Sequence, residues 1–322
     1  MIEKFEHTPV MLHEVLKNLH PEPGDVFVDC TLGGAGHSVQ VAKMLGSDGV
    51  LIGIDQDPLA RKFAREKLES LEKTCSGIPN IVIANANFSE LDEVLLNIPV
   101  AGVDCILFDL GVSSVQLDVL ERGFSYHDGA PLDMRMNTEG NDLTAEIIVN
   151  DSSETELEHI LRVFGEEKCS KQIARNICKT RETARIETSD QLVEIVKSSI
   201  PNKLRRKGGH PAKRTFQALR IAVNDELTCL EEALTGAIRW LNVGGRICVI
   251  SYHSLEDRRV KDAFRSFENR CTCPADVPVC VCQRKPILKT KPRGVILPSV
   301  EEVKNNPRAR SAKMRCAVKV KD

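Results

Sequence analysis

The sequence has 322 residues, enough for one large α/β domain with a smaller insertion or for two modest domains. Hydrophobic residues make up 42% of the chain and charged residues 28%, so we expect a folded protein and exclude a disordered one. No apolar run reaches the roughly 18 residues of a membrane span. Residues 1–19 lack the pattern of a signal or transit peptide, which predicts a cytoplasmic protein.

Cysteine and charge usage narrow the class of protein further. Eight of the twelve cysteines are scattered singly through apolar or helical stretches, which is typical of reduced core residues. The formal net charge is only −2, but residues 203–220, 284–293 and 304–321 contain seven, five and seven Lys or Arg and no acid. Such basic blocks favour a polyanionic partner, although basic surface loops would give the same pattern.

The first part of the chain alternates strands with helices. We expect strands at residues 26–29, 50–55, 81–83 and 104–109, and helices at 38–45 and 58–71. Short apolar strands separated by helices are typical of a mostly parallel, doubly wound α/β sheet with both faces covered.

Between residues 117 and 211 the hydrophobic pattern becomes almost wholly helical. We expect helices at 154–164, 166–179 and 190–199, with Ser153 and Ser189 as N-caps. The α/β pattern then resumes with a helix at 216–241 and strands at 246–252 and 313–320. We therefore predict a sheet domain formed by residues 1–116 and 212–322, interrupted by an all-helical insertion at 117–211.

The expected strands deliver polar or aromatic groups at their carboxyl ends. A glycine-rich loop, residues 33–36, follows the first strand, and Asp55 ends the second, where a carboxylate accepts ribose hydroxyls in such sheets. Phe88 follows the third strand and Asp109 ends the fourth. The loop lacks the Gly-x-Gly-x-x-Gly spacing of dinucleotide sites, so the pattern predicts a different nucleoside-containing cofactor.

Several longer stretches resemble one family, the bacterial 16S ribosomal RNA cytosine-N4 methyltransferases, or ribosomal RNA small subunit methyltransferase H family. They are residues 7–10 (HTPV), 109–114 (DLGVSS), 121–125 (ERGFS), 131–136 (PLDMRM), 210–220 (HPAKRTFQALR), 251–258 (SYHSLEDR) and 306–313 (NPRARSAK). They run in order along nearly the whole chain. The resemblance implies a class I S-adenosylmethionine-dependent methyltransferase fold with a seven-stranded sheet and an inserted RNA-recognition domain.

The implied reaction moves a methyl group from S-adenosyl-L-methionine to the N4 amino group of a cytidine in the decoding region of 16S rRNA, within the small ribosomal subunit. The resemblance also implies the cofactor contacts, which are Gly34, Ala35, Gly36, His37, Asp55, Phe88, Asp109 and Gln116. Val115 stands where the family usually has Pro, which leaves the backbone before Gln116 less rigid.

Transfer to the poorly nucleophilic cytosine amine requires hydrogen-bond acceptors close to it. Asp109 ends the fourth strand, and Tyr252 and His253 follow the fifth. We take Asp109 and His253 as catalytic candidates, although Asp109 as an anchor for the cofactor's amine and His253 as a structural histidine are open alternatives.

Two further groups of residues are candidates for binding. Arg206 lies at the end of the insertion, and Lys213 and Arg214 follow it; all three are candidate phosphate contacts. Lys213 replaces a residue that is more often Thr in the family. The remaining cysteines, clustered as Cys-x-Cys pairs, offer a zinc site with unusually tight spacing or an exposed reduced loop; they are Cys271, Cys273, Cys280 and Cys282. We otherwise expect no metal, and a homodimer is a further expectation.

Other classes of protein share some of these features. A nicotinamide-dependent oxidoreductase would share the sheet and Asp55 but should show the dinucleotide glycine spacing. A non-catalytic ribosome-assembly factor would share the basic blocks but not need the cofactor loops. A methyltransferase acting on another rRNA base or on a protein differs only in its acceptor, which the fold does not determine.

Overall fold

The computed structural model describes residues 9–126, 129–202, 209–268 and 285–322. The chain forms two compact units. Unit 1 combines the N-terminal part up to Gly111 with the C-terminal part from Leu227, and unit 2 is Val112–Glu226. Unit 2 thus begins before the insertion expected at 117–211 and ends after it.

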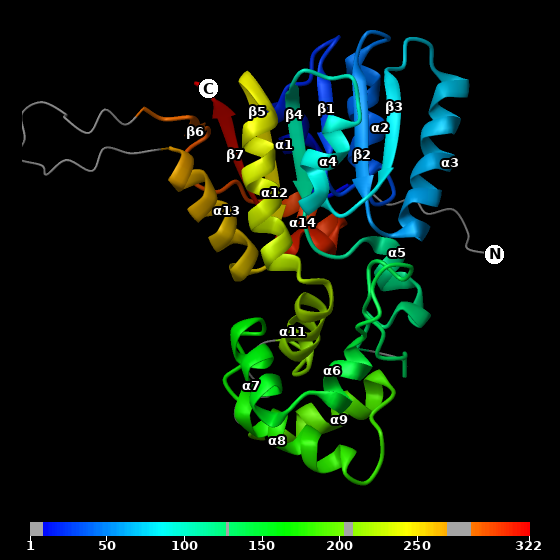
Figure 1. Ribbon diagram of the computed structural model, residues 1–322, viewed down its shortest axis with the longest axis vertical. Coiled ribbons are helices and arrows are strands. Elements are labelled where there is room, and N and C mark those ends of the chain that lie inside the picture. Colours follow the sequence, from blue (N-terminus) through cyan, green and yellow to red (C-terminus); the bar gives the residue numbers. More distant parts are fainter. Residues whose placement is uncertain (1–8, 127–128, 203–208, 269–284) are drawn as a thin grey trace, which may run out of the picture. The chain divides into compact units, whose positions relative to one another are not determined.

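Unit 1 is built on a seven-stranded sheet with the order β3-β2-β1-β4-β5-β7-β6 (Figure 1). The strands are β1 Val26–Asp29, β2 Val50–Asp55, β3 Asn80–Asn85, β4 Val103–Asp109, β5 Leu241–Ser251, β6 Leu288–Thr290 and β7 Lys313–Lys319. The first five pair in parallel, whereas β7 pairs antiparallel with both β5 and β6. The predicted mostly parallel, seven-stranded methyltransferase sheet is confirmed.

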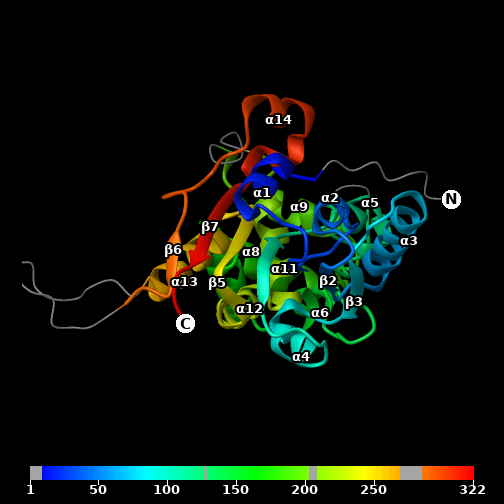
Figure 2. The same ribbon diagram turned by 90° about the horizontal axis from the view of Figure 1, so that it is seen from above.

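Helices cover both faces of this sheet (Figure 2). They are α1 Leu12–Leu19, α2 Gly36–Leu45, α3 Pro58–Thr74, α4 Leu91–Leu96, α12 Glu226–Trp240 and α13 Ser254–Phe267. Unit 1 also contains α14 Val300–Asn305 and the short 3₁₀ turns η1 Phe88–Glu90 and η3 Pro307–Ser311. In β4, Cys105 and Leu107 pack against α1 and α2, while Ile106 and Phe108 pack against α4 and α12. Successive residues of a strand point to opposite faces, so the apolar run in β4 fills two cores at once.

Unit 2 is helical and has a core of its own. Its elements are α5 Ser114–Asp118, η2 Leu120–Arg122, α6 Ala145–Asp151, α7 Glu154–Val163, α8 Ser170–Arg181, α9 Ser189–Ser199 and α11 Lys213–Asn224. Ser153 caps α7 in a reciprocal capping box with Glu156, as expected.

The structure corrects three details of the predicted helices. The helix expected at 216–241 is two helices, because Asp225 adopts a left-handed conformation (φ 45°) between α11 and α12. The helix expected from residue 166 begins at Ser170, since Glu166 also has a positive φ of 47°. Thr188, not Ser189, occupies the N-cap position of α9, in a capping box with Gln191.

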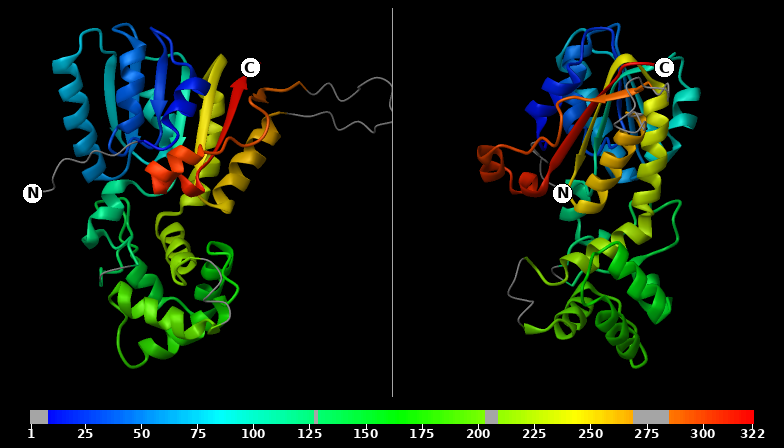
Figure 3. Two further views of the ribbon diagram at one scale, coloured as in Figure 1. Left: turned by 180° about the vertical axis from the view of Figure 1, so that it is seen from behind. Right: turned by 90° about the vertical axis from the view of Figure 1, so that its left-hand side faces the viewer.

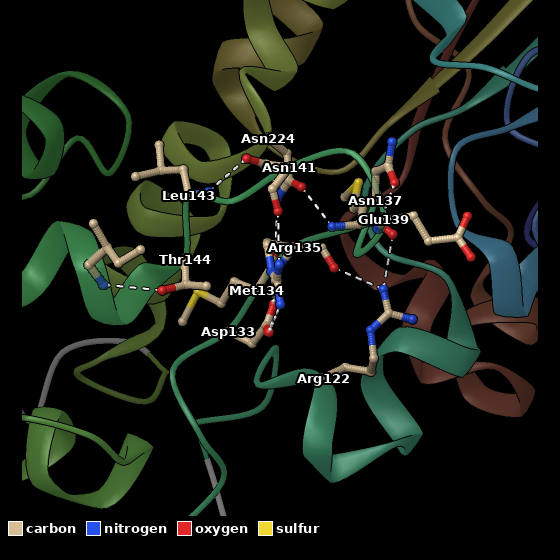
Figure 4. Close-up of polar contacts among 12 residues, drawn as sticks. Arg122, Asp133, Met134, Arg135, Asn137, Glu139, Asn141, Leu143, Thr144 and Asn224 are labelled. Carbon is tan, nitrogen blue, oxygen red and sulfur yellow. Dashed lines mark hydrogen bonds and ion pairs between the residues drawn. The ribbon is translucent and has the colours of Figure 1, made fainter.

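The motifs at 121–125 and 131–136 belong to one network of polar contacts, in which Arg122 donates to the carbonyls of Arg135 and Met136, and the second motif contacts α11 (Figure 4). Asn224 accepts a hydrogen bond from the Met136 amide at 2.7 Å and donates to the Met134 carbonyl at 2.8 Å. Arg135 makes a two-pronged ion pair with Asp133 and also donates to the Asn141 carbonyl. These side chains satisfy backbone groups of a long loop, so the motifs hold unit 2 together.

No helix in the described part of the chain is long and apolar enough to cross a membrane.

Candidate active site

Three neighbouring parallel strands of unit 1 end in aspartates. Asp55 is the last residue of β2, Asp29 of β1 and Asp109 of β4, in the order in which these strands lie in the sheet. Carboxyl ends of parallel strands share one edge, and doubly wound sheets bind ligands there. The three carboxylates therefore mark the candidate site.

Asp29 organises the loop that follows β1. It is buried, and its carboxylate accepts hydrogen bonds from the Ser38 hydroxyl at 2.6 Å and the Thr31 amide at 3.2 Å. Thr31 in turn accepts one from the Asp109 amide through its hydroxyl oxygen at 2.6 Å. Asp29 and Thr31 thus fix β1 and β4 to each other at their carboxyl ends.

The glycine-rich loop leads directly into α2, which begins at Gly36 after Ala35 in a left-handed conformation (φ 56°). A Cβ added at Gly36 would lie 2.7 Å from the Cγ of Pro9, so only glycine lets the N-terminal segment pack here. A Cβ at Gly34 would meet nothing within 4 Å. The loop is therefore closed on the Pro9 side and open at Gly34, where a ligand can approach the backbone.

Asp55 presents its carboxylate to the same loop. Its two oxygens accept hydrogen bonds from the amides of Gly33 at 2.7 Å and Asp57 at 2.8 Å. Burial raises the pKa of Asp55 to about 6, and these two bonds act in the opposite direction. Asp55 is thus positioned at the end of β2 with lone pairs left to accept hydroxyl groups.

Phe88 lies just after β3, in the turn η1. Asn87 caps this turn in a capping box with Glu90, and its amide nitrogen donates to the Gln56 side chain at 3.1 Å. The ring of Phe88 meets Phe108 of β4 edge-on, with centroids 6.0 Å apart. The half-buried ring therefore stands at the sheet edge, where a flat heterocycle can rest against it.

Asp109 is the centre of a polar cluster. Its Oδ1 accepts a hydrogen bond from the Tyr252 hydroxyl at 2.7 Å, and its Oδ2 lies 3.7 Å from Nδ1 of His37. Burial raises the pKa of Asp109 to about 7, which the bond from Tyr252 partly offsets.

His37 is oriented by the N-terminal segment. Its Nε2 lies 3.0 Å from the Val10 carbonyl, which can only accept, so Nε2 carries the proton and Nδ1 keeps its lone pair towards Asp109. Nδ1 of His37 and Oδ2 of Asp109 therefore lie close enough for one cationic donor to contact both of them.

His253 occupies the N-cap of α13. Its Nδ1 accepts a hydrogen bond from the Glu256 amide at 3.4 Å, and its Nε2 lies 3.0 Å from Oε1 of Glu256. The Glu256 carboxylate also accepts from the Tyr252 amide at 2.7 Å. His253 thus starts α13 and, through Glu256, holds the backbone of Tyr252; a catalytic role for His253 itself stays a prediction.

The other predicted site residues belong to unit 2 or lie outside the described residues. Gln116 is in α5, where its side chain accepts a hydrogen bond from the Ser113 amide at 2.9 Å. Lys213 and Arg214 are exposed at the start of α11, and Arg214 donates to the Glu166 carbonyl at 3.0 Å. Arg206 and the four clustered cysteines lie outside the described residues.

Sequence reasoning missed two residues that the structure brings to this edge. Thr31 carries no signal beyond its position in the loop. Glu302 of α14 accepts a hydrogen bond from the Met11 amide at 2.5 Å, across 291 positions of the chain. No local pattern could have indicated that contact.

Comparison with known proteins identifies the family. The model of the MraW methylase family matches residues 4–320. The chain is similar to three proteins that are each named ribosomal RNA small subunit methyltransferase H. It is 50% identical to the protein of Paenibacillus sp., over 98% of this chain and 100% of the relative. It is 48% identical to the protein of Brevibacillus brevis, over 98% of each chain. It is 46% identical to the protein of Symbiobacterium thermophilum, over 98% of this chain and 97% of the relative. The resemblance indicated by the motifs is thus confirmed, and the chain belongs to the MraW methylase family of S-adenosylmethionine-dependent methyltransferases.

Proposed function

We propose that this protein methylates the N4 amino group of a cytidine in the decoding region of 16S rRNA, with S-adenosylmethionine as methyl donor. The relatives are named for methylation of small-subunit rRNA, and the motifs resemble those of the cytosine-N4 enzymes. The observation that carries the proposal is the cluster of Asp109, His37 and Tyr252, which shares the carboxyl edge of the sheet with Asp55.

The residues at this edge fit the chemical groups of the cofactor. Asp55 can accept both ribose hydroxyls, and the ring of Phe88 can flank the adenine. The neighbouring acceptors of His37 and Asp109 match the donor geometry of an α-ammonium group, and the open loop at Gly34 and Ala35 leaves room for the backbone of an amino acid. Gln116 of unit 2 is a further proposed contact.

The reaction joins the cytosine nitrogen to a methyl carbon while the carbon–sulfur bond breaks. S-adenosylmethionine, when bound, supplies that methyl group on a sulfonium, which is a good leaving group. The exocyclic amine is a poor nucleophile, so acceptors must polarise its N–H bonds as positive charge develops.

In this proposal, the Tyr252 oxygen accepts a hydrogen bond from one of those N–H groups. Its own hydroxyl proton points to Asp109, which leaves the lone pairs of the oxygen free to accept. As the new bond forms, the amine proton passes to the Tyr252 oxygen while the tyrosine proton moves to Asp109. A carboxyl whose pKa lies at about 7 can take that proton and release it to solvent at neutral pH.

The remaining proposals concern partners and location. Lys213 and Arg214 of unit 2, together with Arg206, are proposed to contact rRNA phosphates. We propose a cytoplasmic protein that acts on the small subunit, and a homodimer stays a prediction that analytical ultracentrifugation would test.

The test uses small ribosomal subunits from cells that lack the enzyme. The purified protein is incubated with methyl-labelled S-adenosylmethionine, and the digested rRNA nucleosides are identified by mass spectrometry. We expect labelled N4-methylcytidine, lost in Asp55→Ala and Asp109→Ala. Label on another nucleoside would overturn the N4 assignment, and cofactor binding without any label would overturn the rRNA substrate.

A further inference from the structure

The segment that joins β6 to β7 forms a basic projection on unit 1. We call residues 291–312 the C-terminal arm; it contains α14 and η3, and it stands out from the sheet beyond α1 (Figures 2 and 3). It contains five basic residues, Lys291, Arg293, Lys304, Arg308 and Arg310, and only two acids, Glu301 and Glu302. Except for the half-buried Arg308, the basic residues are exposed.

Three of these positive charges have no ion-pair partner among the described residues. No ion pair joins Lys291, Arg293 or Lys304 to another described residue. Of the two acids in the arm, Glu302 accepts a hydrogen bond from the Met11 amide. The arm therefore presents an uncompensated positive surface to solvent.

The base of the arm is ordered and fixed. Ile296 and Met314 exchange two backbone hydrogen bonds, of 2.8 and 2.9 Å, and Ala309 and Ala312 are buried in the core that also contains Met11. These contacts hold the backbone at the base of the arm in place before any ligand binds, which lowers the entropic cost of binding.

The arm is also anchored beside the candidate active site. Glu302 binds the Met11 amide, the neighbouring Val10 carbonyl accepts from His37, and His37 lies 3.7 Å from Asp109. Whatever the arm binds is therefore near the reacting base.

From this placement we infer that the C-terminal arm binds the phosphates of the rRNA strand on one side of the target nucleotide. When the target base is bound in the site, the phosphates on either side of its nucleotide must lie next to the site. Lys and Arg are the side chains that most often bind such phosphates. The inference rests on the proposed function for the identity of the polyanion. It assigns to unit 1 an RNA contact separate from the one proposed for unit 2.

The test compares two variants that lose the same residue types. The arm variant is Lys291→Ala/Arg293→Ala/Lys304→Ala, and the control is Lys62→Ala/Arg65→Ala/Lys73→Ala on the exposed face of α3. Affinity for naked 16S rRNA and for small subunits is measured across a range of salt concentrations, with cofactor affinity measured in parallel. Unchanged cofactor binding would show that both variants are folded.

We expect the arm variant to bind naked rRNA at least about tenfold more weakly, with the slope of log affinity against log salt reduced by about 2 for three lost contacts to single-stranded RNA. The control should stay within about twofold of the parent protein, since a nonspecific charge effect would act on both.

Two outcomes would overturn the inference. Equal losses in both variants would mean that the arm has no specific role, and a loss with small subunits but not with naked rRNA would assign the arm to a ribosomal protein. Failure of the proposed function is distinguishable, because the parent protein would then bind but not methylate rRNA.

Discussion

The hydroxyl of Tyr252 donates a 2.7 Å hydrogen bond to Asp109. The two residues follow neighbouring parallel strands, β5 and β4, and so meet at the same edge of the sheet. Glu256 holds the backbone amide of Tyr252 in place. In the proposed mechanism, this pair joins the group that receives the amine proton to the carboxyl that removes it.

Tyr252→Phe should slow methyl transfer and shift its pH dependence. Loss of the proton relay should lower kcat by about 100-fold. Because the bond from Tyr252 opposes the burial that raises the pKa of Asp109 to about 7, its loss should raise that pKa further and move the acidic limb of the rate profile to higher pH. Rates from pH 5.5 to 9 would check this, with cofactor affinity as the control. An unshifted profile would mean that Tyr252 only packs against the site.

Binding of S-adenosylmethionine should weaken in mild acid. Burial raises the pKa of Asp55 to about 6, and only the carboxylate form, present above that pH, accepts both ribose hydroxyls. We expect affinity to fall by up to about tenfold per pH unit below 6. Calorimetric titration at pH 5.5, 6.5 and 7.5 would measure it.

The matched variants for this prediction are Asp55→Asn and Asp48→Asn. The first should bind weakly at every pH and lose the acid dependence, whereas Asp48 is an exposed turn residue whose replacement should leave the profile unchanged. An acid dependence that survives in Asp55→Asn would assign it to another group.

Asn224 should matter for stability more than for chemistry. Its side chain accepts a hydrogen bond from the Met136 amide and donates to the carbonyls of Met134 and Arg220, all in unit 2. Asn224→Ala would leave partly buried backbone groups without partners, at about 1–3 kcal/mol each. We expect a loss of about 2–4 kcal/mol in the free energy of unfolding, measured with urea.

The control for that variant is Asn97→Ala at the end of α4. Its side chain is exposed and makes one local bond, to the Glu93 carbonyl, so we expect a loss of at most about 0.5 kcal/mol. A loss in Asn224→Ala no larger than in the control would mean that the loop in Figure 4 does not depend on this residue.

The strands could be predicted well because both signals for them, an apolar run and the polar residue that ends it, are local in the sequence. β1 and β2 end at the expected residues, Asp29 and Asp55, and Asp109 ends β4, since buried strands read as apolar runs closed by a polar residue. That the three aspartates lie at one edge of the sheet followed from the rule that the carboxyl ends of parallel strands meet there. The family and the reaction were predicted instead from the resemblance of the long motifs, which hydrophobic periodicity alone cannot indicate.

What sequence reasoning missed depends on contacts between distant residues. The left-handed turn at Asp225 breaks a continuous helical pattern, and an aspartate at that point carries no clear stop signal. The motif at 131–136 offered no hint that it contacts α11, where Asn224 lies 88 positions beyond Met136. The contact between Glu302 and Met11 is more distant still.

Gly111 sets the position of the Tyr252 ring. It has a φ of +93°, and a Cβ there would lie 3.3 Å from Cδ2 of Tyr252, closer than a relaxed contact allows. Gly111→Ala should therefore cost about 1–3 kcal/mol in backbone strain and also push the ring away from Asp109.

Gly244→Ala separates these two effects. Gly244 has nearly the same φ, +91°, but a Cβ there would meet nothing within 4 Å. Both variants should lose similar stability in urea, yet only Gly111→Ala should lower kcat and shift the acidic limb of the rate profile in the direction expected for Tyr252→Phe. If both variants kept the parent kcat, the position of the ring would not limit the reaction, and the proton relay through Tyr252 would be wrong. If both lost activity equally, backbone strain alone would account for the loss.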